Sequence, residues 1–244
     1  MQKVKINKYT VYGINNVTSL VQSKKYDIDK IYIIKDSSAY LNKNLKSKLK
    51  NKNIVYCDNK TFLNKFSFKH TQGIAAIFQI SYLDFIINSN NKNLCYVIID
   101  QMHDPQNLGQ IIRTCECAGV DGIILPKHGS VHITDTVIQV SQGAFFHLDF
   151  FIVSNLNNTI SYLKDNDFWI VGIENSIDSE KWHDIDYKGK VGIVFGSEGS
   201  GIRRLVKKSC DFLATIPMSG KINSLNISAA VSAILFERNR QLLK

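Results

Sequence analysis

Residues 94–113 read LCYVIIDQMHDPQNLGQIIR, an apolar run followed closely by a helical pattern. The run from Leu94 to Ile99 is unbroken, which is typical of a strand covered on both faces of a parallel sheet. Farther on, apolar residues recur with helical spacing at Leu108, Ile111, Ile112 and Cys115. A strand that leads into a helix in this way is the repeating unit of an α/β fold.

The same alternation continues toward the C-terminus. Further strands are predicted at 122–125, 150–153, 169–173, 191–195 and 212–216. Helices are predicted near 136–142, at 156–164, near 202–208 and from about Leu225. We therefore expect a mainly parallel sheet sandwiched by helices, with ligands bound in loops beyond the carboxyl ends of the strands.

A smaller domain precedes this region. Short strands are predicted at 30–35, 53–57 and 73–80, with a lysine-rich exposed helix at 42–52. The polar segment Asn88–Asn93 has no apolar spacing and is the best linker in the sequence. We predict a small N-terminal α/β domain at 1–80, a linker at 81–93 and a larger α/β domain at 94–244.

The positive charge is confined to the first third of the chain. Of the formal net charge of +9, residues 1–70 contribute +11, from 15 lysines and four acidic residues. Residues 71–244 contribute −2, from 15 basic and 17 acidic residues. A basic module joined to a nearly neutral one indicates that one part holds a polyanion on which the other acts. The alternative is a compositional bias, since 25 lysines accompany only five arginines, a pattern that AT-rich codon usage also produces.

Composition excludes several classes of protein. The chain has 244 residues, 44% of them hydrophobic, which is enough for a buried core, yet no stretch approaches the ~20 apolar residues of a membrane span. The start, MQKVKINKYT, lacks the apolar region of a signal peptide, so we expect a cytoplasmic protein. The five cysteines contain no Cys-x-x-Cys pair, which predicts reduced thiols and not disulfides or zinc ligands. His128 and His132 lack a third ligand, so no metal site is expected.

The first motif is Asn-x-Gly-x-x-x-Arg at 107–113. In one interpretation Asn107 is the N-cap of the helix, Gln110 completes a capping-box-like pair, and Arg113 is a surface residue. In the other, Asn107 and Arg113 project near the helix start, where a phosphate is favoured and an arginine can clamp it.

The second motif is Gly-Ser-Glu-Gly-Ser-Gly at 196–201, directly after a predicted buried strand. Three glycines in six positions allow either a close approach of the backbone to a ligand or a plain tight turn. The spacing is neither that of a dinucleotide fingerprint nor that of a phosphate-binding P-loop.

The third motif is IPMSGKINSLN at 216–226. Asn223 or Ser224 could cap the following helix. However, Asn223, Ser224 and Asn226 place three hydrogen-bonding side chains within four positions, which is more than a single cap requires.

Together, and in this order, the three motifs resemble those of the SpoU/TrmH family of RNA ribose 2′-O-methyltransferases, within the SPOUT superfamily. The resemblance runs through Asn107–Arg113, Gly196–Gly201 and the Ile-Pro-Met-x-Gly…Ser-Leu-Asn pattern at 216–226, and it covers essentially all of 94–244. Val11–Val17 and His70–Ala75 resemble the two ends of the ribosomal-protein-L30e-like domain of many members, although Thr71 interrupts the usual His-Gln-Gly.

The resemblance implies an α/β-knot domain, whose C-terminal chain forms a deep trefoil knot, and a homodimer with active sites near the subunit interface. It implies S-adenosyl-L-methionine as cofactor, held chiefly by backbone groups of Gly196, Gly199, Gly201, Ile216, Met218 and Leu225. The catalytic residues that it implies are Arg113, Asn107, Glu198, Ser224 and Asn226. Because a guanidinium is a poor base, we expect Arg113 to hold an RNA phosphate and to stabilise the developing alkoxide.

The implied substrate is structured RNA. The two-domain layout is most similar to members that methylate a guanosine ribose in 23S ribosomal RNA. The alternatives are 2′-O-methylation of transfer RNA by the same family and an RNA-binding protein without catalytic activity. A nucleotide-dependent enzyme of another class, such as a dehydrogenase, would need a dinucleotide fingerprint that the sequence lacks.

Overall fold

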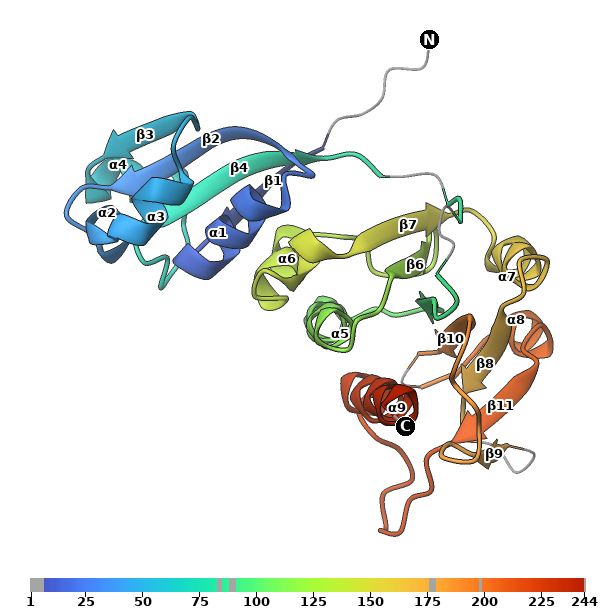
Figure 1. Ribbon diagram of the computed structural model, residues 1–244. Coiled ribbons are helices and arrows are strands. Elements are labelled where there is room, and N and C mark those ends of the chain that lie inside the picture. The colour runs from blue at the N-terminus through green and yellow to red at the C-terminus, as the bar shows by residue number, and fades with distance from the viewer. Residues whose placement is uncertain (1–6, 83–84, 88–90, 176–178, 198, 244) are drawn as a thin grey trace. The chain divides into compact units, whose positions relative to one another are not determined.

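The structure is a computed structural model that describes residues 7–82, 85–87, 91–175, 179–197 and 199–243. The chain forms two compact units (Figure 1). The first contains the chain up to Ser81 together with Ile133–His147, and the second contains Tyr82–His132 and Leu148–Lys244. Within the described ranges, no helix has the length and apolar character needed to cross a bilayer.

The first unit contains a four-stranded sheet. Its strands, in spatial order, are β1 (Asn7–Tyr12), β4 (Ile74–Ile80), β2 (Asp27–Ile34) and β3 (Ile54–Cys57). β1 and β2 run antiparallel to β4, and β3 runs parallel to β2. Its helices include α1 (Ile14–Ser23), α2 (Ser38–Leu41), α3 (Lys43–Lys48) and α4 (Asn59–Lys65). The three strands predicted in this region are confirmed, while the predicted helix at 42–52 is confined to α3, which Asn42 caps by accepting a hydrogen bond from the Leu45 N–H.

Residues 133–147 complete the first unit although they follow β6 in the sequence. They form α6 (Asp135–Val140) and the 3-10 helix η1 (Ala144–His147). The backbone N–H groups of Thr10 and Tyr12, on the edge strand β1, donate to the side chains of Asp135 at 3.0 Å and Gln139 at 3.2 Å. This segment was predicted to belong to the larger domain at 94–244. Its contacts place it in the first unit, because α6 supplies hydrogen-bond acceptors to a sheet edge that lacks a neighbouring strand.

The second unit contains a seven-stranded sheet in which every strand pair is parallel. Its strands, in spatial order, are β7 (Asp149–Val153), β6 (Gly122–Pro126), β5 (Cys95–Ile99), β10 (Val191–Phe195), β8 (Trp169–Ile173), β11 (Phe212–Thr215) and β9 (Glu180–Lys181). The prediction of an α/β fold with a parallel sheet is confirmed. β9 was not predicted, because two residues are too few to carry a strand pattern.

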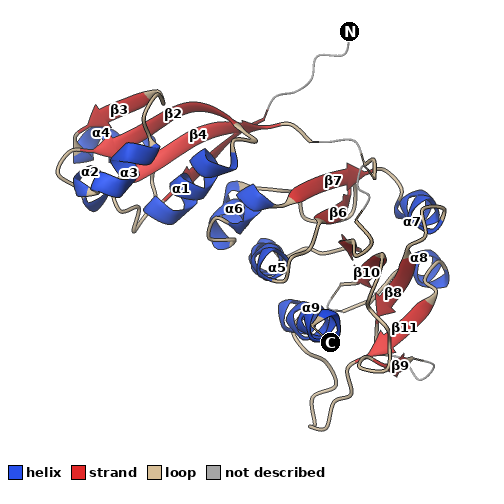
Figure 2. Cartoon of the chain, in the orientation of Figure 1, coloured by secondary structure: helices blue, strands red, loops and turns tan. Residues whose placement is uncertain are grey.

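Helices cover both faces of this sheet (Figure 2). They are α5 (Pro105–Cys117), α7 (Leu156–Lys164), α8 (Arg204–Lys208) and α9 (Ile227–Leu242). α7 and α8 pack on one face, in an apolar cluster with alternate residues of the strands such as Tyr96, Ile98 and Val194. α5 and α9 pack against each other on the opposite side. Burial on both faces explains the unbroken apolar runs of the central strands.

Candidate functional site

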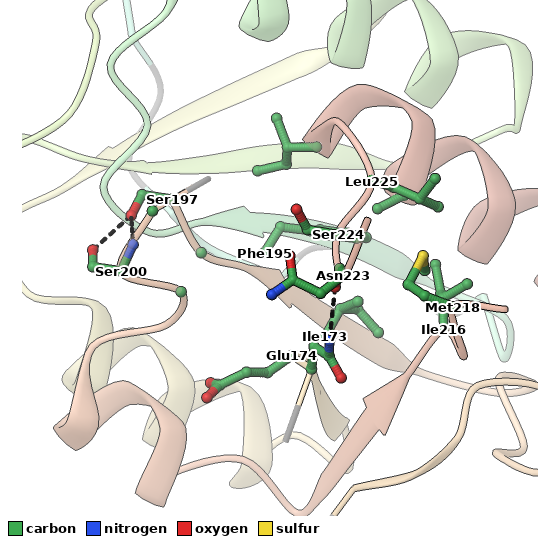
Figure 3. A pocket seen from close by; sticks show the side chains of 16 residues that line it. Ile173, Glu174, Phe195, Ser197, Ser200, Ile216, Met218, Asn223, Ser224 and Leu225 are labelled. Atoms are coloured by element: carbon green, nitrogen blue, oxygen red, sulfur yellow. Dashed lines mark hydrogen bonds between the residues drawn. The ribbon is translucent and has the colours of Figure 1, made fainter. Parts of the chain in front are cut away.

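A cavity of about 420 Å³ lies at the carboxyl ends of β8, β10 and β11, which are neighbours in the sheet (Figure 3). We call it the first cavity. Its walls include the ends of these strands and the residues that follow them, at the edge of the sheet where ligands were expected to bind. All six residues predicted to hold the cofactor line it: Gly196, Gly199, Gly201, Ile216, Met218 and Leu225.

The glycine loop, residues 196–201, follows β10. Ser197 and Gly201 exchange backbone hydrogen bonds of 3.0 and 3.1 Å, so the loop closes on itself. A Cβ at Gly196 would overlap the backbone of Gly201, and Gly201 has φ +65°, so two of the glycines are required by the fold of the loop. Gly199 has open space around it. Glu198, predicted to be catalytic, lies outside the described residues.

One side of the first cavity is apolar and the other polar. Ile173, Phe195, Ile216, Met218 and Leu225 form the apolar side. On the polar side, Asn175 joins two loops, since its Nδ2 donates to the carbonyl of Asn223 at 2.8 Å and its Oδ1 accepts from the Thr215 hydroxyl at 3.3 Å. Asn175 was not singled out by the sequence analysis, because a polar residue after a strand carries no motif of its own.

The helix of the first motif begins earlier than predicted. α5 starts at Pro105, and Asp104 caps it by accepting a hydrogen bond from the Gln106 N–H at 2.8 Å. Proline suits the first helical position because an N–H there would have no partner within the helix. The interpretation of Asn107 as the N-cap is therefore wrong. Asn107 is buried inside the first turn, where its side chain makes a different contact.

That contact joins the first motif to the third. Nδ2 of Asn226 donates to Oδ1 of Asn107 at 3.1 Å, across 119 positions of sequence. Asn226 also caps α9, since its Oδ1 accepts from the Ser228 N–H at 2.9 Å. Neither Asn223 nor Ser224 caps the helix; both line the first cavity. The starts of α5 and α9 are thus linked through two side chains that were predicted to be catalytic.

Arg113 lies on an exposed face of α5. It comes more than two turns after the helix start, about 12 Å along the axis at ~1.5 Å per residue, so the prediction that it projects near the helix start is wrong. Among the described residues, its guanidinium has neither a hydrogen bond nor an ion pair, and it lines neither the first cavity nor the one beside it. Its donors face solvent and can bind a polyanion.

A second cavity, of about 360 Å³, adjoins the first. It is lined by Met102, His103, Asp104 and Asn107 at the start of α5, and by four residues shared with the first cavity. The shared residues are Ser197, Gly199, Ser200 and Ile227. The glycine loop therefore forms a common wall between two cavities, and Asn107 faces the second.

An ion pair that the sequence analysis missed anchors the glycine loop. Asp100, fully buried at the end of β5, accepts from the backbone N–H of Arg203 at 2.9 Å and from its Nε at 2.7 Å. The second guanidinium contact, from Nη2, is 2.6 Å. Because Arg203 lies two residues after the glycine loop, this pair ties the C-terminal end of the loop to the end of β5.

Three of the five cysteine thiols are poorly suited to chemistry. Burial raises the pKa of Cys95 and of Cys210 to about 12 and that of Cys115 well above its usual value, so these three stay protonated. Within the parts of the chain that the structure describes, no three His, Cys, Asp or Glu side chains gather to hold a metal ion.

Comparison with known proteins identifies the family. A profile of the SpoU rRNA methylase family matches residues 94–236, more than half of the chain. The chain belongs to the SpoU/TrmH family of RNA methyltransferases. A family member from Staphylococcus saprophyticus, described as a TrmH family tRNA/rRNA methyltransferase, is 42% identical over 220 residues, which cover 87% of this chain and 88% of the relative.

Solved structures share the fold of this SpoU/TrmH methyltransferase. The SpoU methyltransferase AviRb from Streptomyces viridochromogenes, solved with AdoMet, matches with TM-score 0.83 and 21% identity over 97% of this chain and 91% of that one. An AdoMet-bound rRNA methyltransferase from Sinorhizobium meliloti matches with TM-score 0.83 and 23% identity over 97% and 88%. The TrmH/SpoU tRNA modifying enzyme of A. aeolicus matches with TM-score 0.57 and 28% identity, over 62% of this chain and 76% of that one.

Proposed function

We propose that this SpoU/TrmH methyltransferase binds S-adenosylmethionine in the first cavity and methylates a ribose 2′-hydroxyl of RNA held at the second. The observation that carries the proposal is the pair of cavities with the glycine loop as their common wall. A transfer reaction needs two ligands whose reacting atoms meet, and adjoining sites bring them together.

The residues of the first cavity fit this cofactor. A volume of about 420 Å³ lies within the range of small-molecule sites, which is roughly 300–1,000 Å³. The apolar side suits the flat adenine ring. Gly196 lines the cavity, and its lack of a Cβ lets the glycine loop fold back tightly at the cavity wall. Two of the structural neighbours with TM-score 0.83, AviRb and the rRNA methyltransferase from Sinorhizobium meliloti, were solved with AdoMet.

When bound, S-adenosylmethionine supplies an electrophilic methyl group on a sulfonium. The chain must then place a hydroxyl in line with that methyl group and accommodate the loss of its proton. Asn107 and Asn226 are suited to hold the ribose, because the hydrogen bond between them fixes both amide groups. Ser224 adds a hydroxyl in the wall of the first cavity. We also propose that Glu198 is a catalytic residue, and this proposal rests on its place in the second motif.

For Arg113 we propose a role toward the RNA. A guanidinium binds phosphate oxygens through two parallel hydrogen bonds and stabilises a developing alkoxide by its charge. Its exposed position outside both cavities of its own chain is compatible with an active site completed near a subunit interface.

We further propose a homodimer. α9 exposes an apolar side chain at Phe236, which is 51% exposed, and the preceding loop exposes Ile222, at 74%. The proposal of a homodimer rests on the family resemblance, and these two exposed apolar residues are candidates for its interface. The proposal of a trefoil knot rests on the family resemblance and on the packing of the segments at 196–201 and 216–226 around one cavity.

As substrate we propose structured RNA, with a guanosine of 23S ribosomal RNA favoured over transfer RNA. The rRNA methyltransferase of Sinorhizobium meliloti matches 97% of the chain, whereas the tRNA modifying enzyme of A. aeolicus matches 62%. The first unit carries the excess of lysines, and Lys46 lies 4.2 Å from the ring centre of Tyr40. Cations beside aromatic rings suit RNA, since phosphates bind the former and unpaired bases stack on the latter.

The test is incubation of the full chain with radiolabelled S-adenosylmethionine and unmethylated 23S or transfer RNA, followed by alkaline hydrolysis. Label in an alkali-resistant dinucleotide from 23S RNA is the expected result, because a methylated 2′-hydroxyl cannot attack the neighbouring phosphodiester. Label from transfer RNA alone would contradict the choice of substrate. Alkali-labile label would contradict ribose methylation, and failure of the chain to bind the cofactor would favour an RNA-binding protein without activity.

A further inference from the structure

The carboxylate of Glu174 forms part of the polar side of the first cavity, directly after β8 (Figure 3). Its Oε1 accepts a hydrogen bond from Nζ of Lys207 at 2.7 Å. Its Oε2 is buried and has no hydrogen-bond partner among the described residues. A carboxylate oxygen removed from water is stable only when donors replace the lost hydration, so a ligand with a hydroxyl or amino group fits this position.

The surroundings of this oxygen indicate which ligand group it meets. A Cβ at Gly201 would lie 3.8 Å from Oε2, so the oxygen lies beside the backbone of the glycine loop. Figure 3 shows the carboxylate pointing away from the apolar side chains of Ile216 and Met218. An adenine ring packed against Ile216 and Met218 would leave the part of the cavity beside Glu174 for its attached sugar.

The same juxtaposition serves ribose binding in other parallel α/β sheets. There, a glycine-rich turn after one strand lets the protein backbone approach the phosphates of a dinucleotide, and an acidic residue accepts a hydrogen bond from a ribose hydroxyl. Here the glycine loop follows β10 and Glu174 follows β8, and these strands are adjacent and parallel, with Phe195 opposite Ile173. A carboxylate is an acceptor only, which matches the paired hydroxyl donors of a ribose.

We propose that Glu174 binds the ribose of the cofactor by accepting a hydrogen bond from a ribose hydroxyl through Oε2. The inference rests on the proposed function, since it requires an adenosine-containing cofactor in the first cavity. Lys207 acts as a positioning residue: by holding Oε1 it fixes the direction of Oε2.

The experiment is calorimetric binding of S-adenosylhomocysteine and of 5′-methylthioadenosine, which keeps the ribose but lacks the amino-acid part. The variants are Glu174→Gln, which keeps the size and removes the charge, and Glu180→Gln as matched control, at an exposed glutamate outside the cavity lining. We expect Glu174→Gln to weaken both ligands by about tenfold or more, as is usual for a lost hydrogen bond to a charged group, and Glu180→Gln to bind like the unmodified chain.

Deoxy analogues locate the contact. S-adenosylhomocysteine without its 2′- or 3′-hydroxyl should bind the unmodified chain more weakly, and the loss should be smaller in Glu174→Gln, because the partner is already gone. Circular dichroism checks that the variant is folded. If it is not, Glu174→Asp serves instead, since it keeps the charge and withdraws the oxygen by one methylene group.

Three outcomes separate the alternatives. Unchanged binding of both ligands by folded Glu174→Gln overturns the inference and leaves the proposed function intact. If Glu174→Gln binds S-adenosylhomocysteine more weakly but 5′-methylthioadenosine as before, Glu174 contacts the amino-acid part of the cofactor. That result overturns the ribose contact. If the unmodified chain binds neither ligand, the proposed function fails, and the inference fails with it.

Discussion

Replacing Arg203 by methionine should destabilise the second unit more than removing the charge of its partner, Asp100. The Asp100 side chain is 0% exposed, whereas that of Arg203 is 43% exposed. In Arg203→Met the carboxylate stays buried and keeps only the backbone N–H of residue 203 from this pair. Stranding one member of a buried pair costs about 3–5 kcal/mol, and the retained hydrogen bond favours the lower end, about 3 kcal/mol. In Asp100→Asn the half-exposed guanidinium is hydrated again, so we expect the free energy of unfolding to decrease by only about 1–2 kcal/mol.

The double variant Asp100→Asn/Arg203→Met is the decisive case. It strands no charge, so its loss of stability should be about 1–2 kcal/mol, less than that of Arg203→Met alone. The assay is urea unfolding at neutral pH, comparing the free energies of unfolding of the three variants with that of the unmodified chain. A double variant whose loss equals the sum of the single losses would refute the reasoning, as would an Arg203→Met variant of unchanged stability.

Three further predictions concern catalysis, the glycine loop and acid stability. Arg113→Ala should fold and bind S-adenosylmethionine but lose about 10²–10³-fold in label transfer to RNA, and normal turnover would remove Arg113 from the mechanism. Gly196→Ala should lose at least about tenfold in cofactor affinity by calorimetry, because its Cβ overlaps the far end of the loop. Gly220→Ala is the control and should bind normally, because Gly220 has open space around it and lines neither cavity. The pKa of Glu237 is lowered from 4.5 to about 2, chiefly by its hydrogen bond from Arg240. The stability that this carboxylate contributes is therefore present above pH 4.5 and is lost as the pH falls toward 2. In Glu237→Gln, the midpoint of urea unfolding should decrease less between pH 4.5 and pH 2 than in the unmodified chain. An equal decrease in both would contradict this role of Glu237.

The strands of the second unit could be predicted because each is a buried apolar run, and burial on both faces of a parallel sheet leaves that pattern in the sequence. The first residues of the helices were harder to predict. Asp104 and Pro105 form a cap and first turn that apolar spacing does not reveal, so the start of α5 was placed at Leu108 instead of Pro105. The spacing rule detects the face of a helix and not its end.

The three motifs allowed one wall of each cavity to be predicted, but they did not reveal the ion pairs formed by Glu174 and by Asp100. Glu174 pairs with a lysine 33 positions away, and Asp100 with an arginine 103 positions away. Such pairs depend on which strands become neighbours, and strand order cannot be obtained from local pattern. For the same reason, the side-chain link from Asn226 to Asn107 became visible only in the structure.

The packing of α6 on β1 determines how the chain can be divided. A fragment ending at Ser81 would leave the N–H groups of Thr10 and Tyr12 without the acceptors that Asp135 and Gln139 provide, and an exposed strand edge tends to pair with another chain. Separate expression of the two halves should therefore give an aggregation-prone N-terminal piece. Supplied together, the two pieces should reassociate, because the C-terminal piece carries the segment that covers the edge. Cleavage in the segment before Leu94 would likewise nick the protein without releasing either part, as in fragment complementation.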